Sequence, residues 1–391
     1  MRILILGYIV RCPLGGIAWH HLQYVIGFHQ LGHDVYFLED SGDTEWACYD
    51  PSRGVTTRDS TYGLRFIADT FERAGLNEHW AYYDANRGEW SGPCSGRIRE
   101  ICETADVVFN VSRANPLRPW FEAIPERVLI DTDPVFTQIR LLTIPEERQM
   151  AEKHTSFFSF GQNFGLPGCD IPDDGFPWRP TRQPVTLSQW PIYPPRPDAP
   201  LTTVMQWDSY PTREYIGRLY GMKSLSFGEY FDLPRRTAET IQLAMGTANA
   251  PRQKLRESGW ELSDPLTATR DPWTFQDYIG SSKAEFAIAK HGFVVSNSGW
   301  FSERSAAYLA CGRPLVAQDT GFGTWLPESM AILPFRSLVE AIDALGSLNA
   351  GYTRRCREAR ELVEQCFSHE YVLGKLLEEV FSRSALPEPR A

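Results

Sequence analysis

The chain has 391 residues, of which 42% are hydrophobic and 23% are charged, and its net charge is −10. This composition is typical of a globular protein, and at about 100–200 residues per domain the length predicts two domains. The acidic balance argues against a protein dominated by contacts with nucleic acid or an anionic membrane surface, although it leaves room for a local basic pocket.

The cysteine pattern and the N-terminal residues bear on where in the cell the protein is expected. The 8 cysteines are scattered without a C-x-x-C pair, which argues against a zinc site and a disulfide framework. The opening run MRILILGYIV is too short and interrupted for a signal sequence, and no stretch approaches the ~18 apolar residues of a membrane span. We therefore expect a cytoplasmic protein with reduced thiols and no transmembrane segment.

The opening of the chain has the pattern of a β-loop-α-β unit. Residues 2–7 form a continuous apolar run, which is typical of a parallel strand buried on both faces. The segment IAWHHLQYVIGFHQL has near-helical spacing, Gly32 can close the helix, and VYFLED follows as a strand. Such units build parallel sheets that bind ligands at the C-terminal ends of their strands.

More strands of this kind follow. We expect them at 106–112, 127–133 and 155–163, each ending in a polar or glycine-bearing loop. At about 166–200 proline becomes frequent and the periodicity is lost, which predicts a linker between domains.

A second α/β series begins at LTTVMQW. Helices are predicted at AETIQLAMG and TFQDYIGSSKAEFAIAK, and strands at VVS, PLVAQ and MAILPF. The expected units are an N-terminal Rossmann-like domain at 1–195, a C-terminal Rossmann-like domain at 201–365, and a last segment at 366–391. That last segment combines a helix, for which a return to the N-terminal domain is one option, with a loose tail at ALPEPRA.

The segment SGWFSERSAAYLACGRPLVAQDTGFG, residues 298–323, carries the most chemical information. Ser302 is a good N-cap for a helix over roughly 303–311, which Gly312 ends. The free N–H groups at the helix start, its partial positive charge and the forked donors of Arg304 suit a phosphate or diphosphate. The alternative is an ordinary capped helix with Arg304 in solvent.

This segment, in the form GWFSERSAAYLACGRPLVAQDTGF, is similar to the donor-binding segment of GT-B fold glycosyltransferases, where a helix ends at ACG.P.V. The opening MRILILGYIVRCPLGGIAWHHLQYVIGFHQLGHDVYFLED looks like their N-terminal domain, and YGMKSLSFGEYFDLP resembles a bacterial family-1-like branch. The resemblance covers essentially the whole chain. It implies an α/β protein of the GT-B class, in which two Rossmann-like domains with parallel sheets face each other across a cleft.

The resemblance also implies an activity. It predicts a metal-independent glycosyltransferase without a cofactor, which takes a nucleotide-diphosphate sugar in its C-terminal domain and a small-molecule or glycan acceptor in its N-terminal domain. One feature departs from the pattern. Retaining relatives commonly carry two glutamates in an E-x(7)-E arrangement, and the matching positions here are Gly299 and Ala307. The departure leaves retention versus inversion open.

Donor recognition must therefore come from other residues. We expect Ser302, Arg304 and the loop of Thr320, Gly321 and Phe322 to contribute.

Further donor contacts are expected at three positions. Lys223 lies where GT-B donor domains often place a basic residue against the diphosphate, with a solvated lysine as the alternative. Gly15 and Gly16 lie at the tip of the first loop, where backbone N–H groups can approach a ligand, or where the chain simply turns tightly.

Three side chains are candidate bases. His20 and His21 follow the first loop, and one of them, His20 in preference, is expected to deprotonate an acceptor hydroxyl. The alternative is that one faces solvent and the other packs. Asp133 is the third candidate, in a DTD triplet that resembles a metal-binding D-x-D but is better interpreted as a turn at a strand end.

Two other functions share these features. A GT-B sugar-nucleotide epimerase would use the same diphosphate site, and a catalytically silent sugar-nucleotide-binding protein is suggested by the missing glutamates. A nicotinamide oxidoreductase is disfavoured because the first loop lacks G-x-G-x-x-G.

Overall fold

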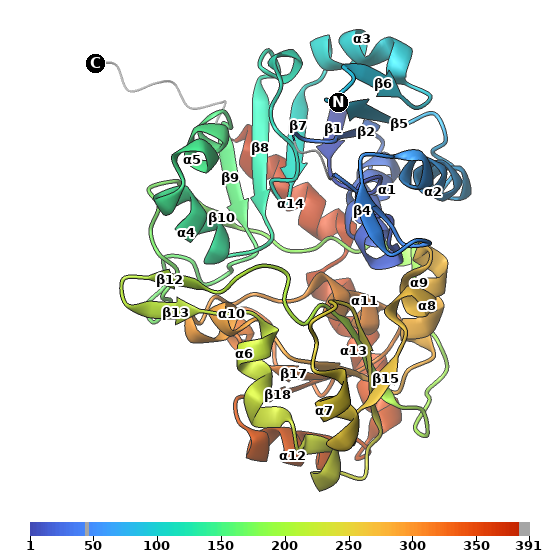
Figure 1. The fold of residues 1–391 in the computed structure, drawn as a ribbon, viewed down its shortest axis with the longest axis vertical. Helices are drawn as coiled ribbons and strands as arrows, with labels where there is room; N and C mark the ends of the chain where they lie inside the picture. Colours follow the sequence, from blue (N-terminus) through green and yellow to red (C-terminus); the bar gives the residue numbers. More distant parts are fainter. Residues whose placement is uncertain (44–46, 383–391) are drawn as a thin grey trace.

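The computed structural model describes residues 1–43 and 47–382, so the tail predicted at ALPEPRA lies outside the described residues. Two α/β halves are stacked along the long axis of the molecule (Figure 1). In the described part of the chain, no helix is long and apolar enough to cross a membrane.

The amino-terminal half is built on an eight-stranded sheet with the order β10-β9-β8-β7-β1-β2-β5-β6. Its strands are β1 (Arg2–Leu6), β2 (Asp34–Asp40), β5 (Trp80–Asp84), β6 (Glu89–Ser91), β7 (Val107–Val111), β8 (Glu126–Asp131), β9 (Ser156–Ser159) and β10 (Arg179–Pro180). Neighbouring strands are parallel except β5 and β6, which are antiparallel. The apolar run at residues 2–7 explains the central position of β1, since Ile3, between Val35 and Val107, is fully buried.

Helices and a hairpin complete this half. They are α1 (Gly15–Gln30), the hairpin β3 (Cys48–Asp50) and β4 (Val55–Thr57), α2 (Thr61–Arg73), α3 (Ile98–Glu103), α4 (Phe136–Thr143) and α5 (Pro145–Glu152). The loop after β1 leads directly into α1, as the sequence predicts.

The carboxy-terminal half contains a six-stranded parallel sheet with the order β15-β14-β11-β16-β17-β18. Its strands are β11 (Leu201–Met205), β14 (Ile241–Met245), β15 (Glu261–Ser263), β16 (Glu285–Ala287), β17 (Leu315–Gln318) and β18 (Ile332–Phe335). A hairpin of β12 (Arg213–Tyr215) and β13 (Arg218–Tyr220) precedes its helices. The helices are α6 (Lys223–Phe227), α7 (Arg252–Glu257), α8 (Pro265–Thr269), α9 (Pro272–Gly280), α10 (His291–Val295), α11 (Glu303–Ala310), α12 (Leu338–Ser347), α13 (Tyr352–Cys366) and α14 (His369–Phe381).

Three assignments in this half differ from the sequence prediction. The helix predicted at AETIQLAMG is strand β14, the one predicted at TFQDYIGSSKAEFAIAK ends with α9 before strand β16, and the strand predicted at VVS falls at the end of α10. Short apolar runs satisfy the periodicity of either element, so pairing with neighbouring strands decides between them.

The last helix, α14, packs on the amino-terminal half. A Cβ on Gly27 of α1 would lie 2.6 Å from Leu373 Cδ1, so the two helices touch closely at this glycine. Val185 extends the contact, because its N–H donates to Phe367 at 2.7 Å and its carbonyl accepts from His369 at 3.0 Å. Figure 1 shows α14 behind β7 and β8, so the chain crosses back to the half in which it began.

Candidate active site

A cavity of about 1360 Å³ lies between the two halves. It is lined at the carboxyl ends of β1, β7 and β8 from one sheet and of β11, β14 and β15 from the other. Ligands of open α/β sheets bind at this edge, and the volume suits a ligand with several groups.

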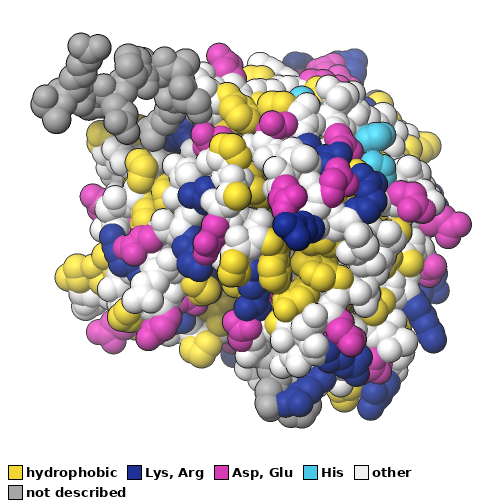
Figure 2. Space-filling model, turned by 90° about the horizontal axis from the view of Figure 1, so that it is seen from above, with side chains coloured by type: hydrophobic (Ala, Val, Ile, Leu, Met, Phe, Trp, Pro, Cys, Tyr) yellow, Lys and Arg dark blue, Asp and Glu magenta, His cyan; other side chains and the backbone are white. Residues whose placement is uncertain are grey.

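The wall of this cavity is basic, although the chain as a whole is acidic. The described residues that line it include seven side-chain cations, namely Arg11, Arg140, Lys223, Arg252, Arg256, Lys290 and Arg304. They also include three carboxylates, namely Asp133, Asp264 and Glu303. On the outer face shown in Figure 2, acidic and basic side chains are interspersed. The excess of positive charge in the cavity favours an anionic ligand.

Helix α11 presents its N-terminus to the cavity. Ser302 caps it, as predicted, with its hydroxyl accepting from the Arg304 N–H at 3.2 Å, and Gly312 follows its end with a left-handed φ of 73°. Arg304 Nε donates to Glu285 Oε1 at 2.5 Å, and Glu285 is fully buried on β16. No described residue bonds to the Nη atoms of Arg304, so a fixed guanidinium faces the cavity with free donors.

Lys223 opens α6 beside this group. Its ammonium makes no hydrogen bond or ion pair with any described residue, although it lines the cavity. Burial, together with the nearby Arg304, lowers the pKa of Lys223 to about 7. An ammonium without a partner at such a site is stabilised by an anion, so Lys223 and Arg304 together form a candidate diphosphate site.

Glu303 is a carboxylate that the sequence prediction did not single out. It lies in the first turn of α11, lines the cavity, and its side chain is bonded to no described residue. It comes four residues after Gly299, where retaining relatives often keep a glutamate. The sequence FSERS therefore does contain a glutamate, but four residues after the position at which the resemblance places one.

The two histidines of α1 have different surroundings. His20 lines the cavity, with Nε2 3.1 Å from Ser112 Oγ and Nδ1 2.5 Å from Gln183 Oε1. Burial lowers the pKa of His20, against the opposing charge of Glu303, so the ring is neutral near pH 7. His21 is fully buried and accepts from the Tyr8 N–H at 3.3 Å, and it is not among the described residues that line the cavity.

Asp133 lines the cavity, but both of its carboxylate oxygens already accept hydrogen bonds. Lys290 Nζ donates to its Oδ1 at 2.6 Å, and the hydroxyl of Tyr210 donates to its Oδ2. Asp131 of the same DTD triplet is buried, and its Oδ1 accepts from the N–H of Asp133 at 2.9 Å, which holds the turn. In the described part of the chain, no group of three or more His, Cys, Asp or Glu side chains is placed to hold a metal ion.

Gly15 and Gly16 open α1, and they pack against α9 of the other half. A Cβ on Gly15 would lie 2.2 Å from the carbonyl oxygen of Asp271, and one on Gly16 would lie 3.2 Å from the ring of Phe275. Gly16 lines the cavity, whereas Gly15 is not among its described lining residues. Contact between the halves therefore requires a glycine at position 15, and a donor contact there stays a prediction.

The loop after β17 adjoins the site, because Thr320 and Phe322 line a small second cavity together with Ser302 and Arg304. None of Thr320, Gly321 and Phe322 is among the described residues that line the large cavity between the halves. Thr320 Oγ1 donates to the Trp300 carbonyl at 2.5 Å, and the Gly321 carbonyl accepts from Asn163 Nδ2 at 3.1 Å. The loop is therefore held by one contact within its own half and by one with the amino-terminal half, and its contacts with a donor stay a prediction.

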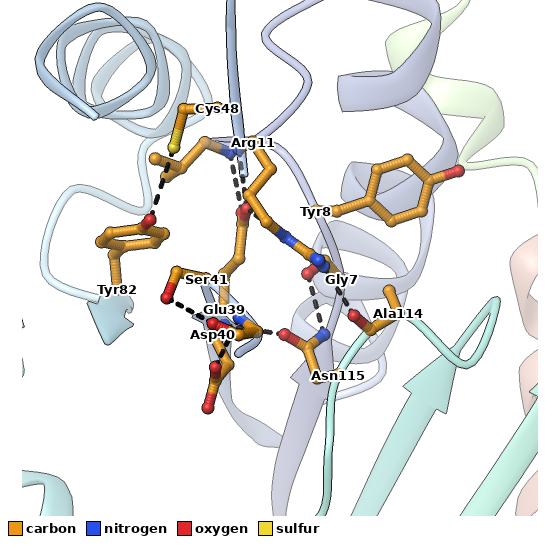
Figure 3. A network of polar contacts seen from close by, with 12 residues as sticks. Gly7, Tyr8, Arg11, Glu39, Asp40, Ser41, Cys48, Tyr82, Ala114 and Asn115 are labelled. Atoms are coloured by element: carbon orange, nitrogen blue, oxygen red, sulfur yellow. Dashed lines mark hydrogen bonds and ion pairs between the residues drawn. The ribbon is translucent and has the colours of Figure 1, made fainter. Parts of the chain in front are cut away.

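Figure 3 shows the polar network that holds the loop after β1. Glu39 of β2 is buried and accepts from the N–H groups of Val10 and Arg11, each at 2.7 Å. Arg11 Nε donates to the same carboxylate at 3.3 Å, and its Nη2 donates to the Ala114 carbonyl at 2.6 Å. Burial raises the pKa of Glu39 to about 7. The network fixes Arg11 in the wall of the cavity.

Solved structures share this architecture. An alpha-glucosyltransferase solved with UDP and a 13-mer DNA aligns over 97% of this chain and 99% of its own, with 11% identity and a TM-score of 0.59. Anabaena HepE, solved with UDP and glucose, aligns over 99% of this chain and 100% of its own, with 11% identity and a TM-score of 0.58. AviGT4, a glycosyltransferase involved in avilamycin A biosynthesis, aligns over 98% of both chains, with 13% identity and a TM-score of 0.52.

These proteins are GT-B glycosyltransferases, and the chain has the GT-B fold, which confirms the predicted class. No protein-family model and no curated protein sequence matches the chain.

Proposed function

We propose that the protein is a glycosyltransferase that moves a sugar from a nucleotide-diphosphate sugar to a hydroxyl of a small-molecule or glycan acceptor, without a metal. The observation that carries this proposal is the unpartnered ammonium of Lys223 beside Arg304, at the N-terminus of α11 in a cavity between two GT-B halves. UDP is present in the solved alpha-glucosyltransferase and HepE structures, which supports a nucleotide diphosphate as the ligand.

In this function the diphosphate is both the group by which the protein binds the donor and the leaving group of the reaction. As the bond from the sugar to the diphosphate breaks, negative charge grows on the departing oxygen. Glu285 holds the guanidinium of Arg304 before the reaction, and the N–H groups of α11 are fixed in the helix, so both stabilise that charge without reorganising. Lys223 lies beside them and adds a second cation. These cations do the electrostatic work for which other enzymes use a metal ion.

The acceptor side is assigned to the amino-terminal half. His20 is the base that takes the acceptor proton, because its neutral ring lines the cavity, whereas the carboxylate of Asp133 is held by Lys290 and Tyr210. A direct displacement assisted by this base inverts the configuration of the sugar carbon. Glu303, close to the diphosphate cations, is placed to accept hydrogen bonds from sugar hydroxyls.

The test is turnover with a panel of UDP-sugars and GDP-sugars, each with and without a mixture of hydroxyl acceptors. We expect release of the nucleoside diphosphate and a new glycoside that appear only when an acceptor is present. Conversion of the donor to an isomer without an acceptor would instead identify an epimerase. Donor binding without turnover across the panel would contradict the transferase assignment.

A further inference from the structure

Both ring nitrogens of His20 are in contact with polar side chains from distant parts of the chain. Nδ1 lies 2.5 Å from Oε1 of Gln183, in the segment after β10, and Nε2 lies 3.1 Å from Oγ of Ser112, at the end of β7. His20 and Gln183 are 6% and 3% exposed, so water does not compete for the contact between them.

The hydrogen bonds of Gln183 determine which way its amide faces. Its Nε2 donates to the carbonyl of His20 at 3.1 Å and to that of Pro184 at 3.2 Å. Carbonyl oxygens only accept, so the amide nitrogen faces them and Oε1 faces the imidazole. Because Oε1 also only accepts, the proton of the neutral ring is on Nδ1, and the lone pair is on Nε2.

The lone pair on Nε2 is directed toward a pair of hydroxyls in the cavity wall. Ser112 Oγ lies 2.7 Å from Thr132 Oγ1, and both residues line the cavity together with His20. Ser112 has a φ of 61°, an uncommon left-handed conformation for serine, which places its side chain at this point. An acceptor hydroxyl that enters here can donate to Nε2 in place of Ser112.

We propose that Gln183 is a positioning residue, which holds His20 in the Nδ1–H tautomer and so presents Nε2 as the base to the acceptor hydroxyl. This inference rests on the proposed function, in which His20 takes the acceptor proton. In the step, the acceptor oxygen bonds to the sugar carbon while its proton moves to Nε2. The bond from that carbon to the diphosphate breaks, and its electron pair leaves on the diphosphate. The Nδ1 proton stays on the ring, hydrogen-bonded to Gln183.

A neutral amide has a different effect from a carboxylate at the same place. It fixes the tautomer without adding a negative charge that would raise the pKa of the ring. Among the described residues, the charged group that faces His20 is Glu303 of α11. The titratable neighbours of His20 on α1 are His21 and Tyr24. Replacing Gln183 by glutamate therefore changes the charge at one defined contact.

Two variants and a control test the proposal. Gln183→Met removes the acceptor for Nδ1–H, and we expect kcat to fall at least about tenfold while the dissociation constant for UDP is unchanged. Gln183→Glu keeps an acceptor, and we expect activity to persist with the acid limb of its pH profile moved upward by about one pH unit. Gln30→Glu makes the same charge change at an exposed site of α1, and its profile should match that of the wild type.

The result that overturns the proposal is unchanged kcat in Gln183→Met together with an unmoved pH profile in Gln183→Glu. Nitrogen-15 NMR of the histidines in the wild-type protein provides a test that does not depend on the variants. We expect the His20 signals of an imidazole protonated on Nδ1, and a ring protonated on Nε2 would also overturn the proposal. Failure of the proposed function would appear separately, as a wild-type protein that neither binds nor turns over nucleotide sugars.

Discussion

Lys290 Nζ lies 2.6 Å from Asp133 Oδ1, which ties the two halves of the molecule together at the wall of the cavity. Asp133 follows β8 of the amino-terminal sheet, and Lys290 precedes α10 of the other half. Tyr210 completes the link, since its hydroxyl bonds to both charged groups. The ion pair therefore connects two units that form the site between them.

Breaking this pair should destabilise the protein. Lys290→Met and Asp133→Asn each leave a half-buried group without its partner, and each should lower the free energy of unfolding by about 2 kcal/mol. The double variant should lose less than the sum of the two, with a coupling energy of about 1 kcal/mol or more, as measured by urea denaturation. Strictly additive losses would show that the pair contributes nothing.

Gly15→Ala tests the contact between α1 and α9. The new Cβ would lie 2.2 Å from the Asp271 carbonyl oxygen, so the halves must shift apart, at a cost of about 1–3 kcal/mol. Gly374→Ala is the control, because a Cβ there meets nothing within 4 Å, and alanine should stabilise α14 by about 0.5–1 kcal/mol. Equal melting temperatures for the two variants would contradict this account of Gly15.

Protonation of His154 should limit stability in acid. Burial lowers its pKa from 6.5 to about 4 and the nearby Arg113 acts in the same direction, whereas the hydrogen bond of Nδ1 to the Ala151 carbonyl opposes the shift. The unfolded chain binds this proton more readily, so stability should fall as pH drops below 6.5 and level off near 4, by up to about 3 kcal/mol. His154→Gln should flatten this part of the curve of unfolding free energy against pH. A curve of unchanged slope would be inconsistent with the buried, neutral ring.

Glu303→Gln tests recognition of the donor sugar. A charged hydrogen bond to a sugar hydroxyl contributes about 1.5–3 kcal/mol, so kcat/KM for the nucleotide sugar should fall about tenfold to about a hundredfold. Affinity for UDP alone should not fall, because the substitution removes a negative charge near Lys223 and Arg304. Steady-state kinetics and calorimetry separate the two effects. Unchanged kinetics would place the sugar elsewhere.

Local features of the fold were predictable from the sequence. The buried first strand, the Ser302 cap and the end of α11 just before Gly312 follow from short-range chemistry, and the structure contains all three. The prediction of a helix at β14 is wrong, since a five-residue, mostly apolar run carries no signal that separates strand from helix.

Contacts between distant segments were not predictable. Gln183 and Ser112 meet His20 from positions 163 and 92 residues away, and neither lies in a motif. The direction of the loop at Thr320–Phe322 depends on Asn163 in the other half, which no local pattern reveals. The resemblance predicts Lys223 as a donor contact. That its ammonium has no partner among the described residues is a property of the folded chain, which the sequence does not show.

The central claim is that Lys223 binds the diphosphate of a nucleotide sugar, and isothermal titration of UDP into wild type and Lys223→Met tests it most directly. An ammonium without a partner destabilises the unliganded protein, so Lys223→Met should melt at the same or a higher temperature while binding UDP at least about tenfold more weakly. Lys375→Met, on α14 outside the described lining of the cavity, is the matched control and should bind UDP like the wild type. Equal UDP affinity for wild type and Lys223→Met would contradict the account.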